Sequence, residues 1–369
     1  MPQSRKIAIL GTRGIPAAYG GFETFAEEIS VRLVAAGHEV TVFCEDAESR
    51  QSSYKGVALK YVKAPKLGPL TTIIFDLLCL LRCIRGYDVV YMLGYGASPF
   101  CFLPRLTGTK VWINMDGLEW KRSKWSPIAK TWLRITENIA RFTASRLIAD
   151  AQAIADDLAT RYRYLPPVST IAYGAPVVET APSADALDNY GITPNDYYLV
   201  VCRLEPENHV AEIIDGFLAA ATSKPLIVIG DHKADNAYVH DLVTRQCDRV
   251  RFIGTVYDPP VLQALRYHAF AYFHGHSVGG TNPSLLEALG SGNCIIAHDN
   301  VFNREVTKNA ANYFADPKDI PALIAFREMD SRSPEETRKA AQKIITSQYS
   351  WELIADHYIS LISHEFQDT

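Results

Sequence analysis

The chain alternates short apolar runs with longer helix-compatible stretches, and this alternation constrains its fold more than any other feature. Residues 6–10 (KIAIL) form a strand-like run that ends in a glycine-containing loop. A helical pattern follows over residues 22–36, and GHEVTVF supplies the next strand, so the chain opens on a β-loop-α-β unit. Further strands are predicted at residues 58–62, 88–92, 110–114 and 146–149. The series predicts an α/β fold with a parallel, doubly wound sheet covered on both faces.

A second α/β series follows a segment rich in Pro and Gly at residues 165–177. Its predicted strands are residues 197–202, 225–229, 250–253, 269–273 and 294–297, and its predicted helices are residues 211–221, 234–247, 259–267 and 283–290. Because 369 residues exceed what one core usually organises, we expect two Rossmann-like domains. We place them at residues 1–175 and 176–350, with a C-terminal helix at residues 351–369.

Composition limits the functional classes. The formal net charge of −4 gives no reason to expect nucleic acid as a partner, so an anionic ligand needs a local site. Seven cysteines without CxxC spacing indicate reduced core residues, and no signal-peptide pattern opens the chain, so we expect a cytoplasmic protein. The apolar stretch 67–84 contains Asp76 and Arg82, which favours a buried helix, with an interfacial helix as the alternative.

The sharpest local motif is GGTNPSLLEALGSG, residues 279–292, which follows a predicted strand. Asn282 is a favoured N-cap residue, and proline suits the next position because its missing N–H has no partner there in any case. We expect the free amides of Ser284 and Leu285 and the helix dipole to form an anion site that matches a diphosphate. A capped helix packed at the sheet edge is the alternative.

Three further positions complete this expected site. The Gly279–Gly280 pair lets the backbone approach a ligand closely, and Glu287 can accept hydrogen bonds from a sugar hydroxyl. Arg203 follows the first strand of the second series, where ligands bind in such sheets, and its guanidinium can neutralise a diphosphate. An ion pair with Glu205 or Glu207 is the alternative for Arg203.

In the first half, GTRGIPAAYGGFETF occupies the loop after the first strand, but its spacing is not the dinucleotide pattern GxGxxG. Gly20 and Gly21 are interpreted as a point where a sugar or phosphate touches the backbone. A polar cluster lies in INMDGLEWKR and predicts an acceptor or sugar site, with solvated loop charges as the alternative; its members are Asn114, Asp116, Glu119, Lys121 and Arg122. His274 and His276 have no further ligand at metal spacing, so no metal site is expected.

Together these motifs resemble the GT-B glycosyltransferases of the large retaining family four, over nearly the whole chain. The resemblance rests on a Gly-Gly helix with the strand after it, a phosphate motif, a base-pocket segment and a Leu-Glu-Ala element. These are YGGFETFAEEISVRLVAAGHEVTVF, VVCRL, VRFIGTVYD and SLLEALGSGNCIIAHD. The ending YSWELIADHYISLI is similar to the terminal helix that crosses back to the first domain of this fold, beyond a cleft between the domains.

More narrowly, GTRGIPAAYGGFETF, NMDGLEWKR and EPENH resemble a bacterial subgroup, once labelled a domain of unknown function, that includes rhamnosyltransferases of polysaccharide assembly. The resemblance implies a nucleoside-diphosphate sugar donor, with dTDP-L-rhamnose the leading choice, and transfer with retention and without a metal or other cofactor. It implies a saccharide or lipid-linked saccharide acceptor and peripheral contact with the inner face of the membrane.

The same resemblance implies roles for residues. In the second domain, the segment with Gly254 and Tyr257 holds the base, Glu287 holds the sugar of the nucleoside, and Arg203 acts on the diphosphate together with the amides of residues 282–285. In the first domain, we hypothesise that Asp116 or Glu119 of the polar cluster orients the acceptor hydroxyl.

Two positions depart from the family pattern. Gly279 stands where the family commonly has Glu, and Asn208 stands where it usually has Lys. Thr281, Asn282 and Asn208 then supply neutral hydrogen bonds in place of the missing charges. A nucleotide-sugar epimerase and a non-catalytic sugar-nucleotide binding partner remain alternative functions, and an NAD-dependent dehydrogenase is disfavoured because neither half has its glycine fingerprint.

Overall fold

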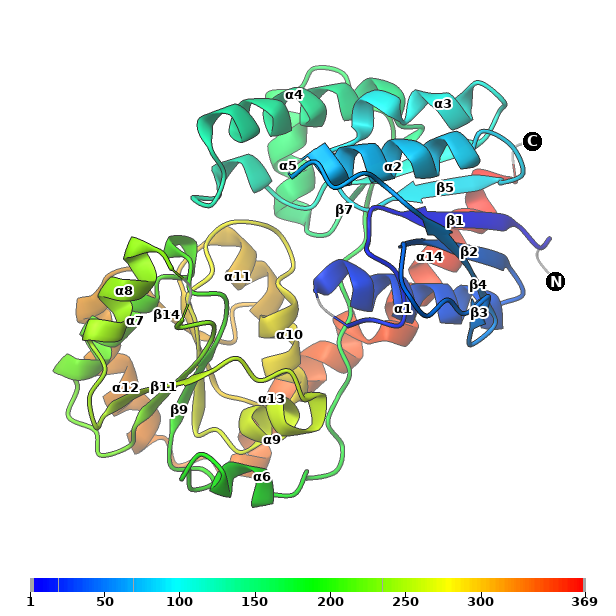
Figure 1. Cartoon of the computed structure of the whole chain (residues 1–369). Helices are drawn as coiled ribbons and strands as arrows, with labels where there is room; N and C mark the ends of the chain where they lie inside the picture. The colour runs from blue at the N-terminus through cyan, green and yellow to red at the C-terminus, as the bar shows by residue number, and fades with distance from the viewer. Residues whose placement is uncertain (1–2, 19, 69, 234, 368–369) are drawn as a thin grey trace. The chain divides into compact units, whose positions relative to one another are not determined.

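The computed structural model describes residues 3–18, 20–68, 70–233 and 235–367. The chain divides into two compact units, which are described separately. The first unit contains residues 1–121, 125–173 and 351–369, and the second contains residues 122–124 and 174–350. Both units are α/β folds built on one sheet each (Figure 1).

The first unit holds an eight-stranded sheet in the order β3-β4-β2-β1-β5-β6-β7-β8. The strands are β1 (Lys6–Leu10), β2 (Glu39–Glu45), β3 (Ser53–Tyr54), β4 (Val57–Val62), β5 (Val89–Met92), β6 (Lys110–Asn114), β7 (Arg146–Ala149) and β8 (Val168–Thr170). Among the described strand pairs of this sheet, β3 and β4 run antiparallel and all others run parallel. The inner strands β1 and β5 are apolar because helices cover both of their faces.

The helices of the first unit lie on both sides of this sheet. They are α1 (Gly21–Ala35), α2 (Leu70–Arg82), α3 (Phe102–Arg105), α4 (Pro127–Thr143), α5 (Gln152–Arg161) and α14 (Trp351–Glu365). Helices α1 and α14 pack together on one face, and α2, α3 and α4 lie on the other (Figure 1). The C-terminal helix therefore completes the core of the unit in which the chain begins.

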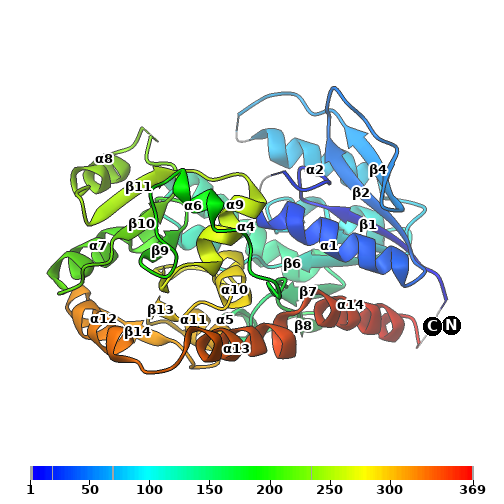
Figure 2. The same cartoon turned by 90° about the horizontal axis from the view of Figure 1, so that it is seen from below.

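The second unit holds a six-stranded, wholly parallel sheet in the order β11-β10-β9-β12-β13-β14. Its elements are β9 (Tyr198–Val201), β10 (Leu226–Ile229), β11 (Val250–Gly254), β12 (Ala271–His274), β13 (Ile295–His298), β14 (Asn312–Phe314), α6 (Asp185–Asp188), α7 (Val210–Ala219), α8 (Ala237–Thr244), α9 (Pro259–Tyr267), α10 (Pro283–Gly290), α11 (Val301–Thr307), α12 (Ile320–Met329) and α13 (Pro334–Ile344). Helices α7 and α12 pack together on one side of the sheet, and α9, α10 and α13 lie on the other (Figure 2).

The structure adds short elements that the sequence pattern does not reveal. Strands β3, β8 and β14 have only two or three residues each, too few for a visible alternation. Strand β8 lies inside the Pro/Gly-rich segment 165–177, which separates the two α/β series in the sequence. The predicted helix 234–247 begins at a residue outside the described ranges, and α8 ends earlier than expected because Cys247 forms a β-bridge with Val250.

The apolar stretch 67–84 folds into α2, which buries Asp76 together with Phe75, Cys79 and Leu80. Within the described ranges, no helix combines the length and apolarity needed to cross a membrane. All seven cysteines are free thiols, and five of them are buried, as the apolar runs around them predict.

Candidate functional site

The sheet of the second unit has its topological switch point between β9 and β12. The chain leaves β9 toward β10 and β11 and then crosses back to place β12 on the other side of β9. In doubly wound sheets, ligands bind at the carboxyl ends of the two strands that flank this point. The loop after β9 carries Arg203, and the loop after β12 carries the glycine pair of the predicted anion site.

Hydrogen bonds join these two loops into one structure. The amide of Ser277 donates to the carbonyl oxygen of Glu207 over 3.0 Å. The side-chain amide of Asn208 donates to the Arg203 carbonyl over 2.7 Å, and the Asn208 Oδ1 atom lies 2.8 Å from His276 Nδ1. A carbonyl oxygen only accepts, so His276 Nδ1 carries the proton of this contact. Asn208 thus links the two strand ends that flank the switch point.

His276 faces the position where the family pattern has a carboxylate. An ideal Cβ atom on Gly279 lies 3.6 Å from His276 Nε2. Burial, together with the charge of Arg122, lowers the pKa of His276 to about 4, so the ring is neutral at pH 7. With its proton on Nδ1, the neutral ring presents Nε2 to this space as a hydrogen-bond acceptor. Sequence reasoning considered His276 only as a metal ligand and missed this arrangement.

Arg203 presents its guanidinium to solvent. Its side chain is 56% exposed, and Nη1 lies 3.7 Å from Glu205 Oε1. That distance is long for an ion pair, and Glu205 makes a closer contact of 2.6 Å with Arg122. The guanidinium of Arg203 therefore remains accessible to an anionic ligand at the end of β9.

The segment Arg122–Lys124 belongs to the second unit, although the sequence analysis places Arg122 in the polar cluster of the first domain. Arg122 Nε donates to Glu207 over 3.2 Å, and the Ser123 hydroxyl also donates to Glu207, over 2.5 Å. Burial alone raises the pKa of Glu207, but the hydrogen bonds from Ser123 and Arg122 outweigh it and the pKa is lowered. Glu205 and Glu207 therefore partner mainly Arg122 and not Arg203.

The start of α10 confirms the predicted cap and corrects the predicted anion site. Asn282 is the N-cap, with Pro283 at the first helical position. The Asn282 Oδ1 atom accepts from the Ser284 amide over 2.9 Å, and the Leu285 amide donates to the Asn282 carbonyl over 3.2 Å. The expectation that both amides are free is wrong, because the capping residue uses both.

The side chains of this helix start are also committed to the protein. Ser284 Oγ donates to the Val201 carbonyl over 2.9 Å and contacts the Tyr272 hydroxyl over 2.7 Å. Leu285 and Thr281 are buried. What remains open toward a ligand is the partly exposed backbone of Gly279 and Gly280. Gly279 has φ of +115°, a conformation that glycine tolerates better than other residues.

The residues predicted for the nucleoside lie at the same edge of the sheet. Glu287 Oε2 lies 2.6 Å from Arg266, an ion pair that leaves acceptor capacity on the carboxylate. Gly254 ends β11 with φ of +85°, and its carbonyl accepts from the Gly230 amide. Tyr257 is 71% exposed. Gly254 ends β11 and Tyr257 follows it, whereas Glu287 lies in the middle of α10, the helix after the loop of the switch point.

In the first unit, Gly20 caps α1 and Gly21 begins it. Gly20 has φ of +105°, and a Cβ atom there would lie 2.5 Å from Glu23 Oε2. The carboxylate of Glu23 accepts from the Arg13 amide over 3.1 Å, so it closes the loop onto the helix start. The point where a sugar or phosphate is predicted to touch the backbone of Gly20 and Gly21 therefore lies beside the carboxylate of Glu23.

The predicted acceptor cluster is divided by the structure. Asp116 has φ of +37°, and its amide donates to Asn114 Oδ1 over 2.8 Å. Glu119 begins a short 3₁₀ helix, and its carboxylate accepts from Trp125 Nε1 over 3.0 Å. Asn114 is buried and donates to the Tyr91 hydroxyl. Asp116 and Glu119 thus stay together after β6, whereas Arg122 belongs to the second unit.

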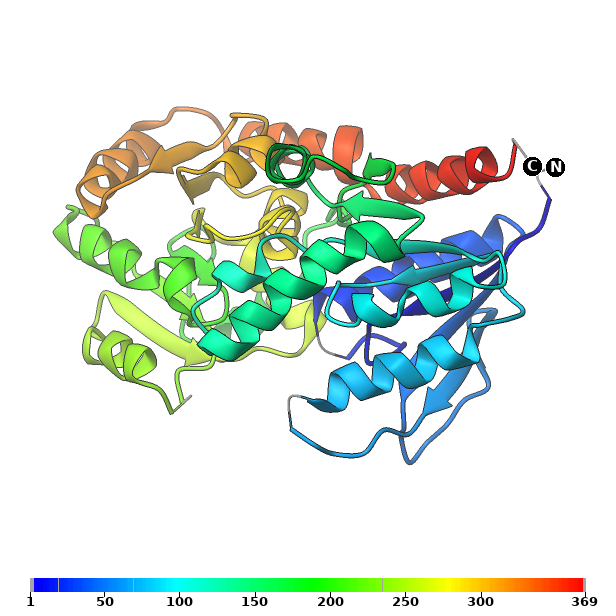
Figure 3. The ribbon, with the colours of Figure 1, turned by 90° about the horizontal axis from the view of Figure 1, so that it is seen from above.

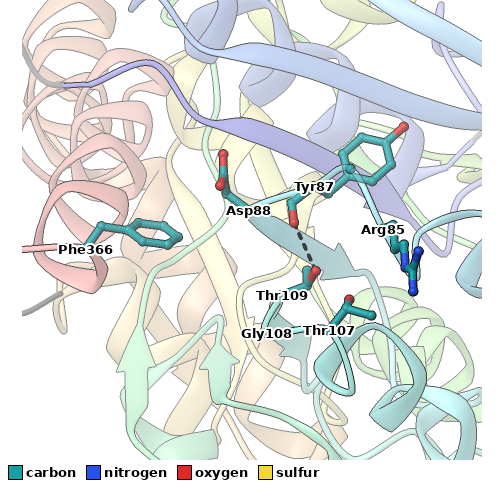
Figure 4. Close-up of a pocket in the computed structure, with 8 residues that line it drawn as sticks. Arg85, Tyr87, Asp88, Thr107, Gly108, Thr109 and Phe366 are labelled. Atoms are coloured by element: carbon teal, nitrogen blue, oxygen red, sulfur yellow. Dashed lines mark hydrogen bonds between the residues drawn. The ribbon is translucent and has the colours of Figure 1, made fainter.

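The structure also has hollows away from these strand ends. One of about 360 Å³ lies where β5 and β6 begin, between Tyr87, Asp88, Thr109 and Phe366 (Figure 4). Thr109 Oγ1 donates to the Tyr87 carbonyl across it over 3.0 Å. This is the amino-terminal edge of the sheet, opposite to the edge where such folds bind ligands. In the described part of the chain, no group of three or more His, Cys, Asp or Glu side chains is placed to hold a metal ion.

Comparison with known proteins identifies the fold. A family model described as a domain of unknown function (DUF1972) matches residues 4–176. No curated protein matches the sequence significantly. Sucrose-phosphate synthase from Thermosynechococcus elongatus matches with a TM-score of 0.80 at 16% identity, over 99% of this chain and all of that one. HepE from Anabaena, in complex with UDP-glucose, matches with a TM-score of 0.77 at 18% identity, over 98% of this chain and all of that one.

A glycosyltransferase from Rickettsia africae matches with a TM-score of 0.72 at 12% identity, over 99% of this chain and all of that one. The fold is that of the GT-B glycosyltransferases. This confirms the predicted two-domain α/β architecture, including the C-terminal helix that returns to the first unit. The predicted roles of the individual site residues stay predictions.

Proposed function

We propose that this protein is a glycosyltransferase that uses a nucleoside-diphosphate sugar as donor. The arrangement at the switch point of the second unit carries this proposal: an accessible arginine, a backbone-exposing glycine pair and a carboxylate lie at one sheet edge. HepE, which shares the fold, is described in complex with UDP-glucose, and this supports a donor of the same chemical class. No cofactor is required by the proposed chemistry.

In this proposal, Arg203 balances the charge of the diphosphate as the sugar leaves. The bond between the anomeric carbon and the phosphate oxygen breaks, and a bond to the acceptor oxygen forms on the same face. The acceptor proton moves to the departing phosphate oxygen, so retention needs no protein nucleophile. Asp116 or Glu119 orients the acceptor hydroxyl. Preorganised positive charge at the leaving group is a large source of rate enhancement in such reactions.

The donor sugar in this proposal is L-rhamnose on dTDP. The space beside Gly279 lacks a carboxylate and faces the neutral acceptor Nε2 of His276. A deoxysugar, which has fewer hydroxyl groups to satisfy than a hexose, suits a site with fewer charged partners. The acceptor is a saccharide or lipid-linked saccharide of surface polysaccharide assembly at the inner face of the membrane.

The test is the Arg203→Ala variant. We expect transfer from dTDP-rhamnose to a membrane-extracted acceptor to fall by about a hundredfold or more, because the leaving diphosphate loses its counter-charge. Arg304→Ala is the matched control: Arg304 is an exposed arginine of the same unit that is paired with Asp299. Product analysis without acceptor distinguishes transfer from epimerisation of the donor. Near-normal transfer by Arg203→Ala would remove the proposed role, and a thermal-shift panel in which no nucleoside diphosphate or its sugar stabilises the protein would remove the proposed function.

A further inference from the structure

A small hollow lies at the amino-terminal edge of the sheet in the second unit. It has a volume of about 200 Å³ and is lined by residues that lead into β9, β12 and β13, and by residues of α12, α13 and the connection between these helices. The proposed donor site lies at the other edge, where the same strands end. We call it the arginine hollow, because Arg327, Arg332 and Arg338 line it.

Arg327 of α12 brings a buried positive charge to this hollow. Its side chain is 7% exposed, and a guanidinium group has five N–H donors. Among the described residues, Nη1 contacts Asp330 over 3.4 Å, Nη2 donates to the Phe270 carbonyl over 3.3 Å, and Nε has no partner. Charge-assisted hydrogen bonds are usually shorter, at about 2.7–2.9 Å. Most of the hydrogen-bonding capacity of this buried cation is therefore unused.

Arg338 approaches the hollow from α13 with its donors in a similar state. Its guanidinium lies 3.9 Å from the centroid of the Tyr267 ring, and Nη2 donates to the Tyr267 carbonyl over 3.4 Å. Its Nε atom is buried and has no partner in the part of the chain that the structure describes. Gly292 leaves room for this side chain, because a Cβ atom there would overlap Arg338 Cγ. The backbone is thus shaped to seat the arginine beside the hollow.

Thr337 adds a neutral donor next to Arg338. It is 7% exposed, and its hydroxyl oxygen has no hydrogen-bond partner among the described residues. A threonine inside a helix commonly bonds the carbonyl three or four residues earlier, and this one does not. Buried polar groups without partners cost stability and are rare in folded proteins. Three of them around one hollow point to a ligand.

The carboxylates that line the hollow are engaged by the protein. Asp330 accepts from Arg332 Nη2 over 2.7 Å and from Arg332 Nε over 3.0 Å. Glu328 accepts from two hydroxyl groups of the protein, over 2.6 and 3.3 Å. Three arginines and two carboxylates give the lining a net charge of +1. The hollow therefore favours an anion that accepts several hydrogen bonds.

We propose that the arginine hollow binds a phosphate group, as inorganic phosphate or as the head of a small phosphomonoester. Two guanidinium groups from different helices and a hydroxyl group match an anion with several oxygens, whereas a carboxylate satisfies one arginine fork. Sites for drug-sized ligands measure about 300–1,000 Å³, so this hollow is too small for a nucleotide sugar. The anion joins α12 and α13, the orange and red-orange helices along one side of the second unit in Figure 3, to residues at the ends of α9 and α10.

Calorimetric titration of the full chain at constant ionic strength tests this inference, which goes beyond the proposed function and needs neither donor nor acceptor. We expect saturable binding of one phosphate per chain. Glycerol 3-phosphate distinguishes the two sources of the group: tighter binding than that of inorganic phosphate assigns the site to a phosphomonoester, and weaker binding assigns it to the free ion. Acetate should bind about tenfold more weakly or worse, because it presents a single pair of oxygens.

Two variants and one control locate the site. Arg338→Gln should weaken phosphate binding by about tenfold or more, because it removes a charged donor group. Thr337→Val keeps the shape of the side chain and should weaken phosphate binding several-fold. In phosphate-free buffer the same variant should not lower the melting temperature, because it removes a buried hydroxyl that has no protein partner. Arg304→Gln is the control, since Arg304 is an exposed arginine of the same unit that is paired with Asp299, and it should bind phosphate as the parent chain does.

The outcomes are distinct. Absence of saturable phosphate binding, binding that Arg338→Gln and Thr337→Val leave unchanged, or acetate binding as tight as that of phosphate overturns the inference. Phosphate binding that Arg203→Ala abolishes and Arg338→Gln retains assigns the ion to the proposed donor site and also overturns it. A nucleoside-diphosphate thermal shift of Arg338→Gln should equal that of the parent chain. That measurement separates failure of the arginine hollow from failure of the proposed function.

Discussion

At the scale of single residues, Asn208 shows how a neutral side chain replaces a charged one. The resemblance implies a lysine at this position and a glutamate at Gly279, and the chain has neither. In the structure Asn208 bridges the Arg203 carbonyl and His276 Nδ1, which leaves His276 Nε2 beside Gly279. Two separate departures from the pattern are therefore parts of one arrangement. Burial of His276 in this arrangement, together with the charge of Arg122, holds the ring neutral.

His276→Gln tests this arrangement through stability. The folded pKa of about 4 lies below the value near 6.5 of an unfolded histidine, so the folded state binds fewer protons at mildly acidic pH. Lowering the pH from 7 to 5 therefore costs the parent chain about 2 kcal/mol at this residue. We expect the free energy of unfolding, measured in urea, to fall by about that much less in His276→Gln than in the parent.

His240→Gln is the control for this pH series, because His240 lies on the exposed surface of α8 in the same unit. His298 is present in both variants and in the parent, so its contribution cancels in the comparison. The pKa of His274 is lowered mainly by burial, which the variant retains, and in smaller part by His276. Equal pH slopes for parent and His276→Gln would show that the imidazole titrates normally and that burial and the charge of Arg122 do not hold it neutral.

The sequence predicts those site residues whose role depends on local structure. The capping of α10 by Asn282 and the position of Arg203 after β9 both follow from neighbours in the chain. The partners of Arg122 do not, because 83 residues separate it from Glu205, and no local pattern encodes such a contact. The prediction of free amides at Ser284 and Leu285 is wrong for a different reason. Asn282, which predicts the helix start, accepts from the Ser284 amide with its side chain and from the Leu285 amide with its backbone carbonyl.

At the scale of elements, α2 carries a carboxylate into the core of the first unit. Asp76 is 6% exposed, and its Oδ1 atom has no hydrogen-bond partner among the described residues. Burial, together with the negative charge of Glu45, raises the pKa of Asp76 to about 7. The helix is therefore most stable in its place when this carboxyl group is protonated.

Asp76→Asn should stabilise the protein in a pH-dependent way. Because the folded pKa lies above the unfolded one, the stability associated with the protonated group is present below pH 4 and is lost as the pH rises through 7. Asparagine has the same shape and no charge to bury. We expect its advantage in the free energy of unfolding to grow by about 3 kcal/mol between pH 5 and pH 8.

Chemical denaturation at the two pH values gives this difference directly. Glu48→Gln, an exposed carboxylate of the same unit, is the control and should follow the parent. A constant difference between Asp76→Asn and the parent across this range would mean that the carboxyl group ionises as it does in water, and that water or a polar group reaches Oδ1 in solution.

The sequence predicts where most elements begin and end, but not which side of a helix is buried. In α4 the 3.6-residue period identifies Ile128, Trp132 and Ile135 as one face, and a globular fold would turn that face inward. The structure turns it outward because the buried Glu137 on the other side has three partners within the unit. Contacts between distant residues decide the rotation of the helix, and these are invisible in its own pattern.

At the scale of the whole molecule, the first unit is built from two distant parts of the chain. Helix α14 packs on α1, and its Tyr358 is 1% exposed. The Tyr358 hydroxyl lies 2.8 Å from that of Tyr91, and its ring contacts Phe25 edge to face at 5.7 Å. The alternating strands predict the two sheets, whereas the return of the C-terminal helix is implied by resemblance and confirmed by the structure.

Tyr358→Ala tests whether this return stabilises the unit. Truncating a fully buried aromatic side chain leaves a cavity, so we expect a loss of about 3–5 kcal/mol in the free energy of unfolding of the first unit. All five tryptophans lie in that unit, so their fluorescence during urea unfolding reports on it selectively. His357→Ala, on the exposed side of the same helix, should change this transition by less than about 0.5 kcal/mol. If Tyr358→Ala changes it as little, α14 is an appendage on a unit that is stable without it. If the loss appears, α14 is as much a part of the first unit's core as the strand β1.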